Sequence, residues 1–173
     1  MWTWVLVFAA IALVWWLFFT KAKPAYYHDQ RLEDLPQFLH SLRGGVRPGG
    51  LLFCKHNESE RFLQFRKDLT PDGKRRIHLG FPNATWSRSY YPVVRELFAV
   101  AGVAFTEKPT GEEGTSTFLL VDGMTQVEAF RVAELACRGM GLGPEARFDI
   151  HLDAAPSYTE WRDFIASGRS ENF

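Results

Sequence analysis

The 173-residue sequence predicts a single-pass membrane protein, in which an N-terminal transmembrane helix precedes an α+β domain with a mostly antiparallel sheet and packed helices. Two observations predict this class. Residues 2–19 form an apolar run without a single charge. Beyond it, strand-like and helix-like segments follow one another in groups, as in α+β proteins.

Residues 1–20 are predicted to be the membrane anchor. The run at 2–19 contains no Pro or Gly, and as a helix it would be ~27 Å long, close to the roughly 30 Å of a hydrocarbon core. No basic residue precedes it and its small residues lie in its middle, so retention is expected rather than cleavage. Its interfacial anchors are Trp2, Trp4, Trp15 and Trp16. A patch for packing against another helix is formed by Ala9, Ala12 and Leu13.

Residues 21–30 are predicted to be a juxtamembrane linker. Lys21, Lys23 and Arg31 follow the apolar run, and no Lys or Arg precedes it. The positive-inside rule therefore predicts an outside N-terminus and a cytoplasmic C-terminal domain. Because only these charges decide the orientation, the reverse orientation stays open.

Residues 31–173 are predicted to form one soluble α+β domain, a common size for a single domain. Leucines at helical spacing predict a helix over 32–42, which Gly44 and Gly45 end. Three strand-like runs follow, at 51–56, 62–69 and 75–81, with a turn signal at 70–73. These runs predict an antiparallel meander.

The second half of the domain is predicted to alternate helices with short strands. Helices are expected over 87–101, over 125–138 with a capping-box spacing of Thr125 and Glu128, and over 157–166 with Trp161, Phe164 and Ile165 apolar. Strands are expected at 103–106, 117–121 and 148–152. The order helix, three strands, helix, two strands, helix resembles that of secretion-chaperone-like domains, without a shared motif.

The charge is distributed unevenly although its net value is zero. Residues 21–80 hold twelve Lys and Arg against seven Asp and Glu, a net of +5, and residues 81–173 have a net of −5. No part reaches the basicity of a nucleic-acid binder. Contacts to lipid phosphates or an acidic partner are expected from Lys21, Lys23, Arg61, Arg66, Lys67, Arg75 and Arg76. Charged strand edges that oppose aggregation are the alternative explanation.

Asp149, His151 and Asp153 alternate along one predicted strand and so share one of its faces. A carboxylate–His–carboxylate row is a weak candidate for a divalent-metal site or a general base. The solvated face of an amphipathic strand explains the same alternation and is preferred. No metal and no cofactor are therefore expected.

Cys54 and His56 also share a strand face, and His78 is expected on a neighbouring strand. A Cys–His pair can act as nucleophile and base, but a structural Cys beside a surface His is preferred. The sequence has no CxxC, P-loop, HExxH, G-x-S-x-G or EF-hand pattern. The glycines at 139, 141 and 143 follow a predicted helix and precede Pro144, so they indicate a helix end and not a dinucleotide site.

These observations predict a non-enzymatic, membrane-anchored accessory subunit of a larger multisubunit membrane complex, for example a respiratory or photosynthetic assembly. Its partners would be the lipid bilayer and other membrane-protein subunits, and not nucleic acid. A membrane-tethered assembly factor or chaperone-like module is the first alternative. The second is an uncharacterised metal-dependent hydrolase built on Asp149, His151 and Asp153.

Overall fold

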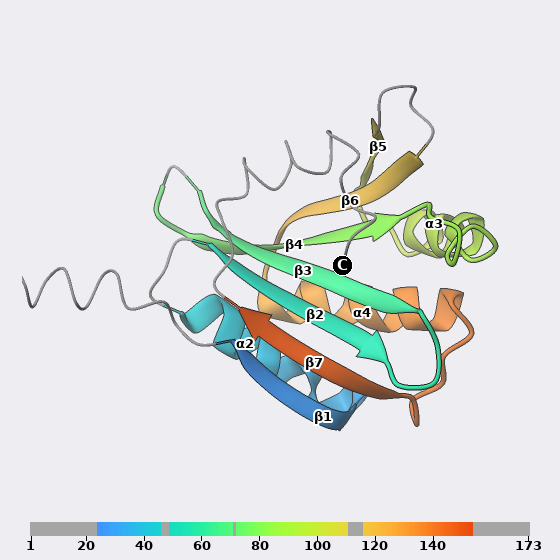
Figure 1. The fold of residues 1–173 in the computed structure, drawn as a ribbon. Coiled ribbons are helices and arrows are strands. Elements are labelled where there is room, and N and C mark those ends of the chain that lie inside the picture. Colours follow the sequence, from blue (N-terminus) through green and yellow to red (C-terminus); the bar gives the residue numbers. More distant parts are fainter. Residues whose placement is uncertain (1–23, 46–48, 71, 111–115, 154–173) are drawn as a thin grey trace, which may run out of the picture.

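A seven-stranded sheet forms the centre of the protein in the computed structural model, which describes residues 24–45, 49–70, 72–110 and 116–153. The strand order is β1-β7-β2-β3-β4-β6-β5, and every neighbouring pair is antiparallel (Figure 1). The strands are β1 (Ala25–Arg31), β2 (Gly50–His56), β3 (Phe62–Leu69), β4 (Arg75–Pro82), β5 (Thr106–Thr110), β6 (Ser116–Met124) and β7 (Arg147–Asp153). The helical elements are η1 (Leu32–Asp34), α2 (Leu35–Gly44), α3 (Tyr91–Val100) and α4 (Gln126–Gly139).

The predicted meander is present as β2, β3 and β4. The turn between β3 and β4 closes through Thr70, whose N–H donates to the Lys74 carbonyl at 2.9 Å and whose carbonyl accepts from Gly73 N at 2.8 Å. Gly73 has a φ of 75°, which favours glycine at this position. The turn predicted at 70–73 is therefore present, and Gly73 supplies the positive φ that it requires.

The last described strand, β7, lies inside the sheet, between β1 and β2. Residues 21–30 were predicted to be a linker, but their described part contributes most of β1, which forms one edge of the sheet. The register between β1 and β7 shifts between Tyr27 and Gln30, where Asp29 has a φ of 57°. This bulge interrupts the alternation of side chains, which is why the sequence pattern did not reveal a strand.

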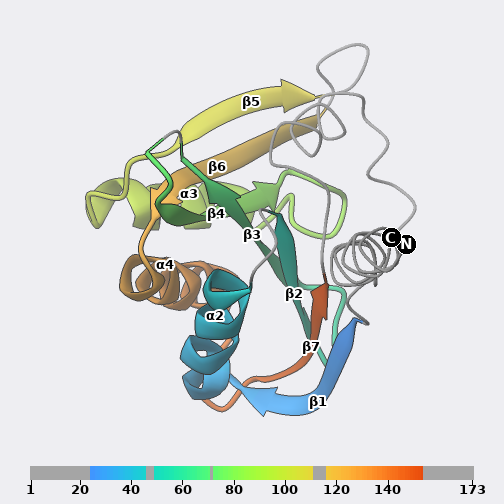
Figure 2. The ribbon, with the colours of Figure 1, turned by 90° about the vertical axis from the view of Figure 1, so that its left-hand side faces the viewer.

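All helices of the described residues that cover the sheet lie on one of its faces, with α2 and α4 against the sheet and α3 beside α4 (Figure 2). The core between these layers is closely packed, since Leu39, Phe65, Leu79 and Ala133 have no exposed surface. The opposite face of the sheet is called the outer face below. Its residues in β7, β2 and β3 are Arg147, Asp149, His151, Asp153, Leu51, Phe53, Lys55, Phe62, Gln64, Arg66 and Asp68.

The predicted single-pass membrane architecture is contradicted. Across the described residues, no helix combines the length and the apolarity that crossing a bilayer requires. The longest, α4, has 14 residues, or ~21 Å, and one of its sides is polar. This finding also contradicts the predicted membrane localisation. The proposed anchor at 1–20, with Trp2, Trp4, Trp15, Trp16, Ala9, Ala12 and Leu13, lies outside the described residues.

Two other elements differ from their predictions. The strand expected at 103–106 begins only at Thr106, as β5, because Val103 and Phe105 instead pack against the core beside α3. The helix expected at 157–166 lies outside the described residues.

Candidate functional site

A strip of five aromatic rings crosses the outer face of the sheet. It starts at the edge strand β1, passes over β7, β2 and β3, and ends in the segment between β4 and α3. It is called the aromatic strip below, and its members are Tyr26, His151, Phe53, Phe62 and Trp86.

The rings of the strip form two contacting groups that meet at neighbouring strand positions. Tyr26 stacks on His151 with ring centroids 4.3 Å apart and planes 15° apart. Phe53 lies directly opposite His151 in the neighbouring strand. Phe62 follows, 4.6 Å from Phe53 and 4.7 Å from Trp86. Such cross-strand aromatic pairs stabilise the sheet and hold each ring in place.

The strip is held from below as well as from its sides. Trp86 also meets Phe81, a fully buried core residue, in an edge-to-face contact at 5.8 Å. At the other end Tyr26 is 62% exposed, and the remaining members are half-buried. The strip therefore has one end, at Trp86, that is packed against the core and another, at Tyr26, that is exposed to solvent.

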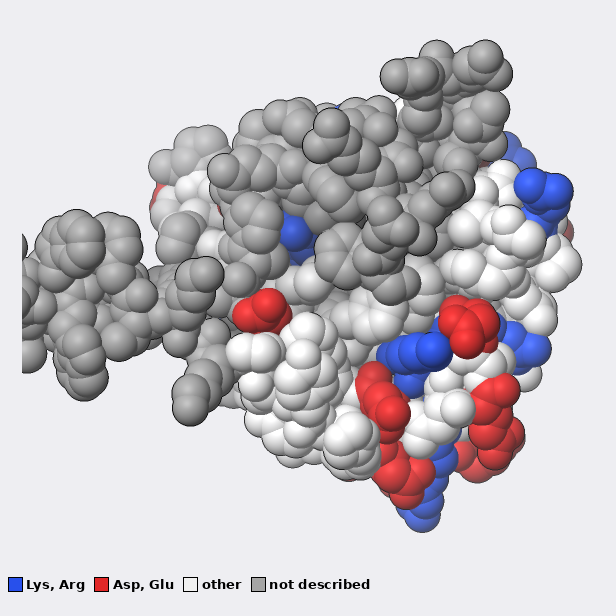
Figure 3. Space-filling view, in the orientation of Figure 1, with Lys and Arg blue, Asp and Glu red and all other residues white. Residues whose placement is uncertain are grey.

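The charges around the strip balance. Asp149 lies opposite Lys55, and the Lys55 ammonium is also 3.3 Å from a Glu60 carboxylate oxygen. Lys/Arg and Asp/Glu side chains are interspersed on the visible surface (Figure 3). In β2 to β7 the described positions of the outer face hold five cations and four carboxylates, and the fifth cation, Arg147, pairs with the Asp29 carboxylate of β1 at 3.4 Å. These residues are Lys55, Arg66, Arg76, Lys108, Arg147, Asp68, Asp122, Asp149 and Asp153.

This balance matters for the kind of ligand. A surface for a phosphate backbone needs an excess of cations, whereas aromatic side chains surrounded by mixed charges are typical of protein interfaces. The outer face has the second composition.

The row Asp149, His151 and Asp153 shares the outer face, as its spacing predicted, but its members have different partners. Asp149 accepts a hydrogen bond from the Asp29 backbone N–H at 3.3 Å and lies 3.4 Å from His28 Nδ1. His151 stacks on Tyr26. Within the described residues, no group of three or more His, Cys, Asp and Glu side chains is arranged to hold a metal ion.

The residues of the Cys–His hypothesis are not brought together. Cys54 is buried on the helix-covered side of β2, and the His56 ring lies against Phe148 with its Nδ1 2.9 Å from Ser59 Oγ. His78 lies on the outer face of β4, with β3 between the two strands, and its Nδ1 is 2.9 Å from an Asp122 oxygen.

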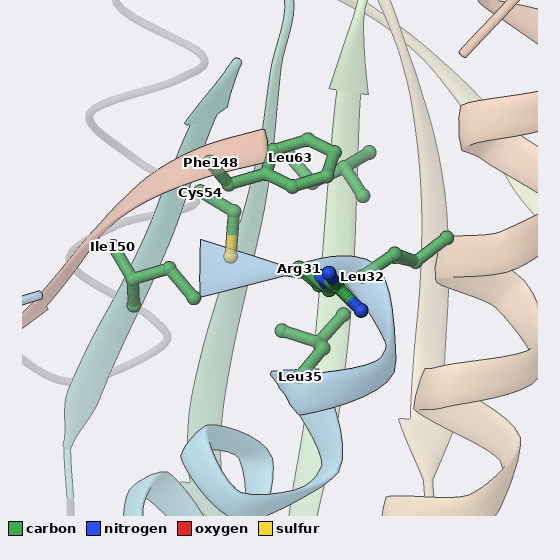
Figure 4. Close-up of a pocket in the computed structure, with 7 residues that line it drawn as sticks. All are labelled: Arg31, Leu32, Leu35, Cys54, Leu63, Phe148 and Ile150. Atoms are coloured by element: carbon green, nitrogen blue, oxygen red, sulfur yellow. The ribbon is translucent and has the colours of Figure 1, made fainter. Parts of the chain in front are cut away.

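Cys54 borders a small pocket between the sheet and η1–α2 (Figure 4). The pocket has room for about one water molecule. Burial raises the pKa of the Cys54 thiol, and it raises that of Cys137 to about 12. Both thiols are free and buried, so they act as small core side chains. The pocket is lined by Arg31, Leu32, Leu35, Cys54, Leu63, Phe148 and Ile150.

The expected basic cluster is divided between the two faces of the sheet. Arg66 points to the outer face and Lys67 to the helix layer, and both are 2% exposed. Lys67 Nζ donates to the Gly45 carbonyl at 2.8 Å, and Arg75 Nη1 donates to the Gly44 carbonyl at 3.2 Å. Both cations thus satisfy carbonyl groups at the C-terminal end of α2.

The other basic residues also contact the protein itself or lie outside the described part. Arg61 Nη2 donates to the Tyr90 hydroxyl at 2.8 Å, and its guanidinium carbon is 4.7 Å from the Tyr90 ring centroid. Arg76 lies opposite Asp68. Lys21 and Lys23 lie outside the described residues.

The sequence analysis missed the aromatic strip. The sequence placed Phe62 in a predicted strand at 62–69, but only the strand order reveals that β7 lies beside β2 and brings His151 next to Phe53. Comparison with protein-family models, curated proteins and solved structures finds no match for this chain.

Proposed function

We propose that the protein is a non-enzymatic accessory subunit of a larger protein complex and that it binds its partner through the aromatic strip. The observation that carries the proposal is the row of five aromatic side chains across four strands and the adjoining loop, in which Tyr26–His151 and Phe53–Phe62–Trp86 are in ring contact and Phe53 lies opposite His151. Aromatic residues are enriched at the centres of protein interfaces and supply much of their binding energy.

Two further properties of the strip support a protein partner. Its rings are packed against their neighbours before binding, so little side-chain freedom would be lost in a complex. The balanced charge of the outer face provides both signs at the rim, where complementary charges set specificity. An assembly factor would use the same surface for transient binding, and stoichiometry separates the two functions.

Co-purification at native expression level tests the proposal with a pair of matched variants. Phe62→Asp places a charge in the middle of the strip, and Val127→Asp places one on α4, where Val127 is 79% exposed and remote from the outer face. Loss of a central anchor costs about 2 kcal/mol or more, so partner recovery should fall by roughly 30-fold for Phe62→Asp. Wild type and Val127→Asp should recover the same partners in equal amounts.

Tyr26→Asp provides a second variant at the exposed end of the strip, where the fold tolerates a charge because Tyr26 is 62% exposed. Circular dichroism and thermal unfolding establish that each variant is folded. Equal partner recovery by Phe62→Asp, Tyr26→Asp and Val127→Asp would exclude the strip as the binding surface. Stoichiometric partners support an accessory subunit, and substoichiometric ones an assembly factor.

A further inference from the structure

The strand β6 has a bulge near its end, on the outer face of the sheet. The pairing of β4 with β6 shifts register between Ile77 and Leu79, so two residues of β6, Asp122 and Gly123, lie opposite the single residue His78. Gly123 has a φ of 72°, which a bulge of this kind requires. The bulge turns a side chain, that of Asp122, and a backbone N–H, that of Gly123, toward the His78 ring.

The ring nitrogen Nδ1 of His78 lies within hydrogen-bond distance of both bulge residues. Asp122 Oδ1 is 2.9 Å away and Gly123 N is 3.3 Å away. An ionised carboxylate only accepts hydrogen bonds, and a backbone N–H only donates them. Nδ1 can therefore satisfy one of these groups at a time. It donates to Asp122 when it carries a hydrogen, and it accepts from Gly123 when it does not.

Packing holds the imidazole between these two groups. His78 is 7% exposed, whereas the Asp122 side chain is 48% exposed. Val121 and Met124, on either side of the bulge, are buried. Because the ring and the flanks of the bulge are fixed, a change in the protonation of His78 acts first on the two bulge residues.

Charged side chains of both signs face His78. Arg66 lies directly opposite it in β3 and is buried, and Asp68 lies diagonally opposite in the same strand. Arg76 is two residues away on the same face of β4, and Asp122 lies on β6. These described neighbours, two guanidinium groups and two carboxylates, have no net charge. Protonation of the imidazole therefore adds one positive charge to this part of the outer face.

We propose that His78 and the Asp122–Gly123 bulge form a switch that a proton operates. In the neutral imidazole the hydrogen is on Nε2, and Nδ1 accepts from the Gly123 N–H. In the imidazolium form Nδ1 donates to Asp122, and the Gly123 N–H loses its acceptor. Histidine is the side chain that commonly changes charge between pH 5 and 8, so acidification over this range exchanges one contact for the other.

This inference goes beyond the proposed function, because it makes the charge of the outer face depend on pH. Its test involves no partner, so its failure would leave the proposed function unaffected.

Nuclear magnetic resonance of the full-length, ¹⁵N-labelled protein tests the switch directly, since the chemical shift of a ring nitrogen reports whether it carries a hydrogen. Nδ1 of His78 should carry none at about pH 8 and one at about pH 5. The amide shift of Gly123 should change with the same midpoint. Its protection factor against hydrogen exchange should fall by about 2- to 10-fold on acidification, as expected for the loss of one hydrogen bond.

His78→Asn assigns the effect to this side chain, because the asparagine amide oxygen lies close to the position of Nδ1 and cannot be protonated. The Gly123 amide should then no longer titrate. His28→Gln is the matched control. His28 Nδ1 also lies beside a carboxylate oxygen, 3.4 Å from Asp149 Oδ1, but its side chain is 79% exposed and belongs to the edge strand β1. This variant should leave the titration of the Gly123 amide unchanged.

The wild-type protein alone can overturn the inference, so the test does not depend on the folding of His78→Asn. A hydrogen on Nδ1 at both pH values would make the Asp122 contact permanent. Its absence at both would make the Gly123 contact permanent. Either result contradicts a switch, and so does a Gly123 amide that is insensitive to the titration of His78 or that still titrates in folded His78→Asn.

Discussion

At the scale of single residues, Lys67 shows how one side chain can satisfy a backbone carbonyl group at the end of a helix. Its ammonium is carried by β3 and donates to the Gly45 carbonyl just beyond α2. Burial, together with the nearby Arg75 charge, lowers the pKa of Lys67 to about 8 from its usual 10.5. The folded protein therefore disfavours the charged amine that the unfolded chain carries without cost.

The shifted pKa of Lys67 predicts how the free energy of unfolding depends on pH. Between about pH 8 and 10.5 the native state has released this proton and the unfolded state retains it. Because the unfolded state binds more protons, this residue's contribution to stability rises with pH through that window, by roughly 3 kcal/mol in all. Urea unfolding at pH 7.5 and 9.5 should show about 2 kcal/mol of this gain in wild type and none of it in Lys67→Met.

Lys74→Met is the matched control for this titration, because the Lys74 side chain is 67% exposed and pairs with Asp72 in the turn. It should keep the pH dependence of wild type. If Lys67→Met and wild type gained the same stability between the two pH values, the buried lysine would not be the titrating group.

At the scale of elements, the contact between α3 and α4 depends on a glycine. A Cβ atom on Gly139 would lie 2.6 Å from Val94 Cγ2 and 3.0 Å from Val94 Cα. The two helices can therefore approach this closely only where α4 has no side chain. The sequence analysis interpreted Gly139 only as part of a helix end, since the partner helix could not be known.

Gly139→Ala should destabilise the protein by about 1–3 kcal/mol, because the added methyl group would force α3 away from α4. Gly44→Ala is the matched control, since nothing lies within 4 Å of its Cβ position and its φ is not positive. It should leave the midpoint of urea unfolding unchanged or slightly higher. Equal midpoints for the two variants would contradict the close approach of the helices.

Local chemistry made several elements predictable from sequence. β3 has the predicted bounds, 62–69, because a strand-like run and the strong turn signal after it define them. α4 begins with the predicted capping box, in which the Glu128 N–H donates to Thr125 Oγ1 at 3.3 Å and the Thr125 N–H donates to Glu128 Oε2 at 2.7 Å. Each of these features depends on residues close together in the chain.

The edge strand β1 was not predictable in this way. Its sequence lacks alternation, and its bulge at Asp29 is held by distant residues: Arg147 Nη1 donates to the Asp29 carbonyl at 3.1 Å, and Asp149 accepts from the Asp29 N–H. The candidate site depends on the same long-range pairing, because β7 must enter between β1 and β2 before Tyr26, His151 and Phe53 become neighbours. Strand order of this kind is not encoded in local spacing.

At the scale of the whole molecule, the sheet has two faces with different tasks. One face forms the core with α2 and α4, and the other presents the aromatic strip within a neutral surface. The proposed function is based on this division. The first face is buried under α2 and α4, whereas the second carries aromatic rings that are packed against one another.

The central claim is that a partner contacts the aromatic strip, and site-specific photo-cross-linking tests it most directly. Phe62 is replaced by p-benzoylphenylalanine in one full-length protein and Val127 in another, and both are irradiated at native expression level. The account predicts that a co-purifying partner becomes covalently attached from position 62 and not from position 127. Attachment from position 127 alone would place the partner on the helix layer and contradict the account.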